Sequence, residues 1–165
     1  MKTLTIIPSR LSASRLPGKP LLKIKGFPII SHVFKKAMEA NIGDVIVATE
    51  DQEIIDEVLK NGGKAILTSK NHKTGTDRIF EAIEKLGESE VELVMNLQGD
   101  EPLINIEDIR NLHIQMVKNK SRMGTLASNI LKKDQYTQEN VVKVITKENL
   151  GSSNFPEAIN FLRKS

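Results

Sequence analysis

Short apolar runs alternate with segments of helical periodicity along this chain. Runs typical of buried strands lie at 4–7, 45–48, 65–67 and 93–97. Segments with apolar residues at helical spacing lie at 28–40, 51–59, 76–86 and 106–118. Because strands joined by helices form parallel sheets covered on both faces, this alternation predicts an α/β fold with three αβα layers and a mostly parallel sheet.

Local signals predict where two of these helices begin. Asp51 is expected to cap the second helix, and Gly62-Gly63 to end it. Thr76 or Asp77 is expected to open the third helix.

Toward the C-terminus the periodicity is weaker. Segments near 123–130 and at 141–145 are β-prone. Apolar residues at 158, 159, 161 and 162 recur at helical spacing and predict a short terminal helix.

The composition narrows the class of protein. A chain of 165 residues with 39% hydrophobic residues suits one domain with a real core. The net charge of +3 mildly favours acidic ligands, but 21 acidic residues among the basic ones and only 4% aromatics disfavour nucleic-acid binding. No cysteine is present, which fits a reducing cytoplasm, and Pro8 interrupts the opening apolar run too early for a signal peptide or membrane span.

Three cations lie in one loop after the first apolar run. Arg10, Arg15 and Lys19 occupy this loop, and the prolines and glycine within 17–20 disfavour a regular element there. The carboxyl end of a strand is where open parallel sheets bind ligands, and guanidinium groups match phosphate oxygens. The loop therefore predicts an anion site suited to a nucleoside triphosphate, while a solvated basic loop stays open as the alternative.

Two familiar phosphate-binding motifs are excluded. A dinucleotide fingerprint needs closely spaced glycines after the first strand, and residues 8–17 contain none. A P-loop needs Gly-Lys-Ser or Gly-Lys-Thr entering a helix, but Lys19 is followed by Pro20. Side chains and irregular backbone must therefore hold any phosphate.

A second constellation follows the strand at 93–97. Asp100 and Glu101 come after Gly99, a residue that permits close backbone approach. Mg²⁺ typically takes one or two carboxylates and fills its other positions with phosphate oxygens and water, so Asp100 alone could anchor it. A plain Gly-Asp turn remains the alternative.

A third constellation lies at 72–78, before the third helix. Its hydroxyls, glycine and exposed N–H groups at a helix start can bind an anion or the polar edge of a base. An ordinary capping sequence would look the same.

These three segments together resemble one known family. They read Ile-Ile-Pro-Ser-Arg…Ser-Arg-Leu-Pro-Gly-Lys-Pro-Leu at 6–21, His-Lys-Thr-Gly-Thr-Asp-Arg at 72–78 and Asn-Leu-Gln-Gly-Asp-Glu-Pro at 96–102. In this order they closely resemble the 3-deoxy-manno-octulosonate (KDO) cytidylyltransferases, the CMP-KDO synthetases of lipopolysaccharide biosynthesis. The resemblance runs from about residue 3 to Ile145. It implies a Rossmann-like fold of the nucleotide-diphospho-sugar transferase type, and transfer of CMP from CTP to KDO with Mg²⁺ and release of pyrophosphate.

The resemblance also implies roles for residues in all three segments. Arg10, Arg15 and Lys19 would bind and polarise the triphosphate beside the backbone of Pro8 and Ser9; Thr74, Gly75 and Arg78 would lie near the cytidine; Gln98 near cytidine or sugar; and Asp100 would hold magnesium. Catalysis would then depend mainly on electrostatic clamping and alignment.

The C-terminal end is expected to depart from the family. The resemblance implies a nucleotide-binding cytidylyltransferase domain at 1–146, incomplete relative to the family, and a divergent tail at 147–165. Family members continue with a region that supplies a second magnesium carboxylate, most of the KDO pocket and much of the dimer contact. Three alternatives stay open: a catalytically impaired CTP-binding remnant, a half-protein that needs a partner chain, and CMP transfer to sialic acid. CTP and KDO are the expected partners, a homodimer is considered, and membrane insertion is not expected.

Overall fold

The computed structural model describes residues 1–12, 16–87, 89–149 and 155–163. The chain forms two compact units, Met1–Val117 and Lys118–Ser165. This boundary falls before the 146/147 division proposed from the sequence, so the residues from 118 to 146 belong to the second unit. None of the helices among the described residues is long and apolar enough to cross a membrane.

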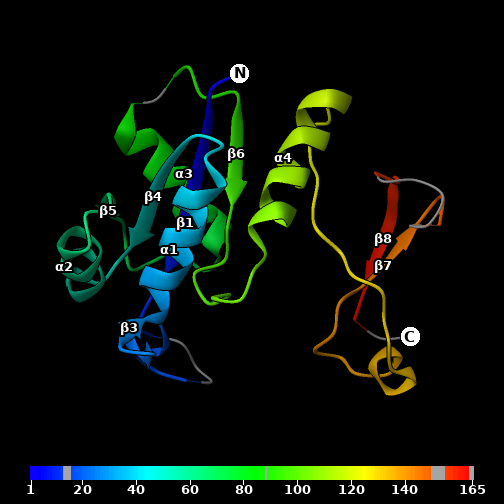
Figure 1. Cartoon of the computed structure of the whole chain (residues 1–165), viewed down its shortest axis with the longest axis horizontal. Coiled ribbons are helices and arrows are strands. Elements are labelled where there is room, and N and C mark those ends of the chain that lie inside the picture. Colours follow the sequence, from blue (N-terminus) through cyan, green and yellow to red (C-terminus); the bar gives the residue numbers. More distant parts are fainter. Residues whose placement is uncertain (13–15, 88, 150–154, 164–165) are drawn as a thin grey trace. The chain divides into compact units, whose positions relative to one another are not determined.

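A four-stranded parallel sheet forms the centre of the first unit. Its strands are β1 (Thr3–Ser9), β4 (Asp44–Thr49), β5 (Ala65–Leu67) and β6 (Leu93–Asn96), in the order β5-β4-β1-β6. Every pairing is parallel, with Ile6 opposite Ile46 on one side and Asn96 on the other. All the carboxyl ends therefore meet at one edge of the sheet, as the alternation of strands and helices predicted (Figure 1).

Helices cover both faces of this sheet. They are α1 (Ile29–Ala40), α2 (Gln52–Lys60), α3 (Gly75–Leu86) and α4 (Ile106–Asn119). Side chains of α1, α2 and α4 pack with Ile7, Val45 and Val47 in one core cluster. Residues of α3 pack with Leu4 and Ile6 in the other, on the opposite face. Alternate residues of a strand point to opposite faces, so β1 contributes to both clusters. The predicted three-layer αβα fold is confirmed.

Short elements follow the basic loop. A 3₁₀ turn, η1 (Lys19–Leu21), leads into a small antiparallel hairpin of β2 (Lys23–Ile24) and β3 (Phe27–Pro28). Gly18 precedes the turn with φ 72°, a left-handed conformation that glycine adopts without penalty. The loop therefore turns sharply just before Lys19.

One predicted helix start is corrected, and one predicted N-cap is confirmed in position but not in its side-chain bond. Helix α3 begins at Gly75 and not at Thr76 or Asp77, because Thr74 is the N-cap. The Thr74 Oγ1 accepts a hydrogen bond from the Asp77 N–H, and the Asp77 carboxylate accepts one from the Thr74 N–H. Asp51 does occupy the N-cap position of α2, but its side chain makes no capping bond. Its carboxylate instead accepts a hydrogen bond from a distant backbone N–H, that of Leu11.

The second unit differs from the sequence prediction at two places. It contains η2 (Lys133–Tyr136), β7 (Lys143–Thr146) and β8 (Ala158–Leu162), and the predicted terminal helix at 158–162 is wrong. This segment pairs antiparallel with β7, and tertiary pairing overrides a short apolar pattern that fits either structure. The β-prone segment at 123–130 forms no strand, whereas the β-prone segment at 141–145 contributes to β7.

Candidate nucleotide-binding site

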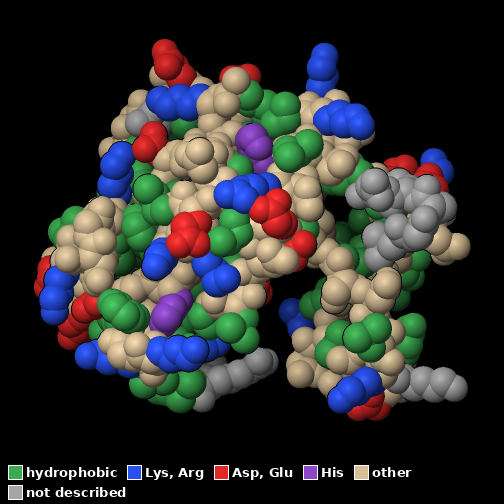
Figure 2. Space-filling view, viewed as in Figure 1, with side chains coloured by type: hydrophobic (Ala, Val, Ile, Leu, Met, Phe, Trp, Pro, Cys, Tyr) green, Lys and Arg blue, Asp and Glu red, His purple; other side chains and the backbone are tan. Residues whose placement is uncertain are grey.

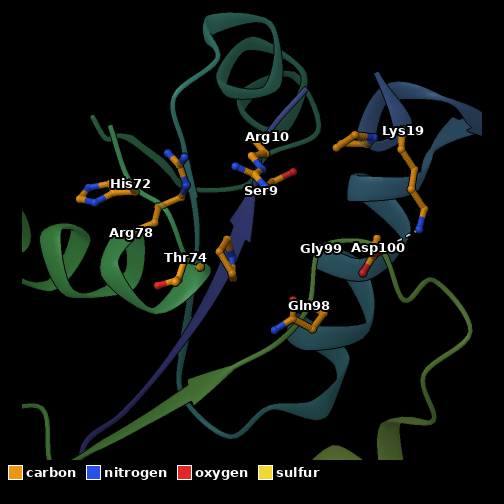
Figure 3. A pocket seen from close by; sticks show the side chains of 12 residues that line it. Ser9, Arg10, Lys19, His72, Thr74, Arg78, Gln98, Gly99 and Asp100 are labelled. Atoms are coloured by element: carbon orange, nitrogen blue, oxygen red, sulfur yellow. Dashed lines mark hydrogen bonds and ion pairs between the residues drawn. The ribbon is translucent and has the colours of Figure 1, made fainter. Parts of the chain in front are cut away.

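A cavity of about 290 Å³ opens at the carboxyl edge of the sheet in the first unit. It is lined by residues from the end of β1, from η1, from the segment before α3 and the start of that helix, and from the loop after β6 (Figure 3). The lining residues are Pro8, Ser9, Arg10, Lys19, Pro20, His72, Thr74, Gly75, Arg78, Gln98, Gly99 and Asp100. All three segments singled out in the sequence therefore meet at one cavity.

Close packing of backbone brings the ends of β1 and β6 together. A Cβ atom added to Gly99 would lie 2.9 Å from the Pro8 carbonyl oxygen, so no larger residue fits without movement of the backbone. The same proline contacts the start of α3, where a Cβ on Gly75 would lie 3.3 Å from the Pro8 Cγ. The expectation that Gly99 permits close approach is confirmed, and Pro8 lies at the junction of the three segments.

The basic loop contributes two cationic side chains to the cavity. Lys19 Nζ lies 2.7 Å from Asp100 Oδ2, and both side chains are partly exposed. Arg10 is exposed, and among the described residues no carboxylate pairs with it. In Figure 3 Arg10 lies at the end of β1, and Lys19 lies across the cavity with its ammonium directed at Asp100. Arg15, the third predicted cation, lies outside the described residues.

Arg78 lines the cavity but its charge is already paired. Its side chain is only 3% exposed, and its guanidinium forms an ion pair with Glu50, which is 9% exposed. The same group donates hydrogen bonds to Thr68 Oγ1 and to the Ser69 carbonyl oxygen. A buried charge must be paired in this way, so Arg78 holds the end of β4 and the loop before α3 together.

His72 is fixed by a carboxylate from α3. Its Nε2 contacts Glu81 Oε2, and the same oxygen accepts a hydrogen bond from the Ser69 N–H at 2.8 Å. Lys85, the Ser69 N–H and His72 together lower the pKa of Glu81 from 4.5 to about 2. Glu81 is therefore ionised and can only accept hydrogen bonds, which assigns a proton to His72 Nε2.

Thr74 uses its side chain locally. Its hydroxyl accepts from the Asp77 N–H and donates to the Asp77 carboxylate at 2.7 Å. Thr74 and Gly75 nevertheless line the cavity, so the N-terminus of α3 borders it. Backbone N–H groups and the helix dipole make such an end favourable for anions.

Asp100 is the candidate metal ligand. Its side chain is 53% exposed at the cavity, and only one of its oxygens is paired with Lys19. The described part of the chain contains no cluster of three or more His, Asp or Glu side chains able to hold a metal ion. A single carboxylate fits the way Mg²⁺ binds to a protein when phosphate oxygens supply further ligands.

Sequence reasoning missed a few cavity residues. Pro20, His72 and Gly99 line the cavity but had no predicted binding role. All three lie inside the quoted segments, so proximity in sequence to the predicted residues could have identified them. The pairing of Arg78 with Glu50 could not have been identified in this way. Glu50 follows β4 and Arg78 lies in α3, and no rule of sequence spacing connects these two positions.

Comparisons with known proteins place the chain in a family. The family model described as cytidylyltransferase matches residues 4–162, so the chain belongs to the cytidylyltransferase family. The match includes most of the 147–165 segment, for which the sequence predicted divergence.

Individual relatives with nearly half of their aligned residues identical show which cytidylyltransferases the chain is similar to. The chain is 46% identical over 150 residues to the 3-deoxy-manno-octulosonate cytidylyltransferase of Fusobacterium nucleatum, covering 90% of this chain and 60% of the relative. It is 47% identical over 144 residues to the enzyme of the same name from Afipia carboxidovorans, and this alignment covers 87% of this chain and 58% of the relative. The chain thus spans about 60% of the length of these relatives.

A solved structure supports the same likeness. It is that of CMP:2-keto-3-deoxy-manno-octonic acid synthetase complexed with CTP, with a TM-score of 0.83 and 34% sequence identity. The alignment covers 99% of this chain and 65% of that chain. The predicted family resemblance and fold class are confirmed.

Proposed function

We propose that this protein is a CTP-dependent cytidylyltransferase that transfers CMP to KDO and releases pyrophosphate, in lipopolysaccharide biosynthesis. The observation that carries the proposal is the cavity at the carboxyl edge of the sheet, where Arg10 and Lys19 of the basic loop and Asp100 of the loop after β6 line the same space. The names of the similar relatives and the CTP complex of the similar structure support the choice of substrates.

The cationic side chains would act on the triphosphate. Arg10 has no carboxylate partner among the described residues, and a guanidinium can bind two phosphate oxygens at once. Lys19 would exchange its contact with Asp100 for a phosphate oxygen, since an exposed ion pair of this kind is worth only about 0–1 kcal/mol. Arg15, in the same loop, would add a third cation. These cations would stabilise the charge that develops on the leaving pyrophosphate.

Other cavity residues would position the nucleotide. Thr74, Gly75 and Arg78 would lie near the cytidine, and the backbone of Pro8 and Ser9 beside the nucleotide. Gln98 would contact cytidine or sugar; its side chain is exposed at the cavity and its Nε2 donates to Asn96 Oδ1 at 3.2 Å.

Asp100 would hold Mg²⁺. When bound, the cation would neutralise part of the triphosphate charge and leave the reacting phosphorus more open to attack. When the Lys19 ammonium moves from Asp100 to the phosphates, the Asp100 carboxylate would become available to Mg²⁺. A cytoplasmic location and a homodimer remain predictions from the sequence.

The test is pyrophosphate release by the purified 165-residue chain with Mg²⁺, CTP and KDO, beside calorimetric CTP binding. Release that requires both substrates supports the proposal. We expect Lys19→Ala and Asp100→Asn to lower turnover far more than they lower stability, and Glu53→Gln, an exposed change on α2, to leave both unchanged.

Other outcomes would favour the alternatives. CTP binding without release would indicate a catalytically impaired remnant, and activity restored by a second chain would indicate a half-protein. Release with sialic acid but not with KDO would change the acceptor.

A further inference from the structure

The backbone of Leu11 anchors the loop that carries the cations. Its N–H donates to Asp51 Oδ2 at 2.7 Å, and its carbonyl oxygen accepts from the Gly18 N–H at 2.9 Å. Arg10 directly precedes Leu11, and Lys19 directly follows Gly18. The positions of both cations therefore depend on the backbone of one residue, Leu11, which Asp51 holds from outside the loop.

Asp51 makes this contact at the expense of a local one. It occupies the N-cap position of α2, where an aspartate side chain usually accepts a hydrogen bond from the first turn of the helix. No such bond is present, and the carboxylate reaches a residue 40 positions earlier in the chain. An acidic side chain that gives up its helix cap for the basic loop indicates that holding the loop is its main role.

The neighbouring residue, Glu50, extends the connection. Its carboxylate accepts a hydrogen bond from the Ser12 hydroxyl at 3.2 Å and pairs with the buried Arg78. Glu50 thus joins the basic loop to Arg78 at the start of α3, while Asp51 holds the same loop at Leu11.

We propose that Asp51 is a positioning residue for the triphosphate site, which fixes Arg10 and Lys19 through the backbone of Leu11. The proposal rests on the proposed function for the identity of the ligand. Asp51 does not line the cavity, so it would act through the loop and not by touching the nucleotide.

The sign of the effect separates positioning from plain electrostatics. Removal of a negative charge near a cationic site should strengthen anion binding by Coulomb attraction alone. If Asp51 holds the cations in place, its removal should weaken CTP binding. We expect Asp51→Ala to weaken CTP binding by about tenfold, the scale of one lost charge-assisted hydrogen bond, and Asp51→Asn to do so less.

The matched control is Glu53→Gln. Glu53 lies in the first turn of the same helix and is exposed, so its loss removes the same charge without touching the loop. We expect CTP affinity in this variant to be unchanged or slightly higher.

Amide hydrogen exchange in the ligand-free chain tests the anchor itself. In Asp51→Ala the amides of Leu11 and Gly18 should exchange faster, while that of Val47 in the buried strand β4 keeps its wild-type protection. General destabilisation would speed exchange at all three positions. If Asp51→Ala does not fold, Asp51→Asn serves for both measurements.

The outcomes are separable. Wild-type affinity for CTP in Asp51→Ala, or unchanged exchange at Leu11, would overturn the positioning role and leave the proposed function standing. Failure of the wild-type chain to bind CTP would overturn the proposed function, and exchange at Leu11 would still decide whether Asp51 anchors the loop.

Discussion

Arg10 and Arg78 line the same cavity but their charges are used in opposite ways. Arg10 is exposed and has no carboxylate partner among the described residues, whereas Arg78 is 3% exposed and paired with Glu50, whose side chain is 9% exposed. Arg10 therefore offers its charge to a ligand, whereas Arg78 uses its charge to hold the fold. The comparison teaches that residue type and position at a cavity do not determine a role; the partners of the side chain do.

Figure 2 shows how charged side chains are distributed over one face of the molecule. On the face it shows, Lys and Arg side chains are interspersed with Asp and Glu and form no continuous basic stripe. Charge at the cavity is thus a local feature made by a few side chains.

The largest expected effect on stability is that of Arg78→Met. This change leaves the Glu50 carboxylate buried without its partner and should lower the free energy of unfolding by about 3–5 kcal/mol. Urea denaturation would measure it. The double variant Glu50→Gln with Arg78→Met should be less destabilised than Arg78→Met alone. An equal loss of unfolding free energy in both variants would show that the unpaired Glu50 carboxylate is not the cause of the destabilisation.

A smaller loss of unfolding free energy is expected for Gly99→Ala. The new methyl would lie 2.9 Å from the Pro8 carbonyl oxygen, and overpacking of this kind costs about 1–3 kcal/mol. Gly75→Ala is the matched control, because its methyl would lie 3.3 Å from the Pro8 side chain, at a helical position that favours alanine. Thermal unfolding of both variants should rank Gly99→Ala as the less stable; the reverse order would show that the strand ends are not tightly packed.

The Glu81 carboxylate predicts a pH dependence of stability. Its pKa is lowered from 4.5 to about 2 by Lys85, the Ser69 N–H and His72. Since the folded state favours the ionised form, this contribution is complete above pH 4.5 and is lost as the pH falls toward 2. The difference in unfolding free energy between wild type and Glu81→Gln should therefore shrink over that interval.

The exposed Glu84 provides the comparison for this titration. It lies on the same helix, and Glu84→Gln should show a much flatter difference from wild type over the same pH range. A parallel pH dependence in both variants would mean that the network around Glu81 contributes nothing specific.

Arg10→Met should have the smallest effect on folding. An exposed side chain away from caps and core normally changes stability by no more than about 0.5 kcal/mol. CTP binding should nevertheless weaken strongly, because one phosphate contact is removed. For the same reason the affinity for CTP should fall less steeply as salt is added. A variant that folds less stably but binds CTP normally would reverse the assignment of roles to Arg10 and Arg78.

Much of this arrangement could be predicted from the sequence. The parallel sheet followed from buried runs that alternate with helical segments. The basic loop and the Asp100 segment were each placed directly after a strand, and the family resemblance assigned all three motifs to one nucleotide. The pairings of Arg78 with Glu50 and of Asp51 with Leu11 could not be predicted, because they join residues that are close only after folding. The strand at Ala158–Leu162 was missed for the same reason, since its pairing with β7 outweighs a short pattern that also suits a helix.

The most direct test of the division of roles is a calorimetric titration of CTP, with Mg²⁺, into wild type, Arg10→Met and Lys19→Met at two salt concentrations. We predict that wild type binds one CTP per chain and that both variants bind more weakly, with a smaller loss of affinity on adding salt. Equal affinity in all three proteins, or no binding by wild type, would contradict the assignment of this cavity to the triphosphate.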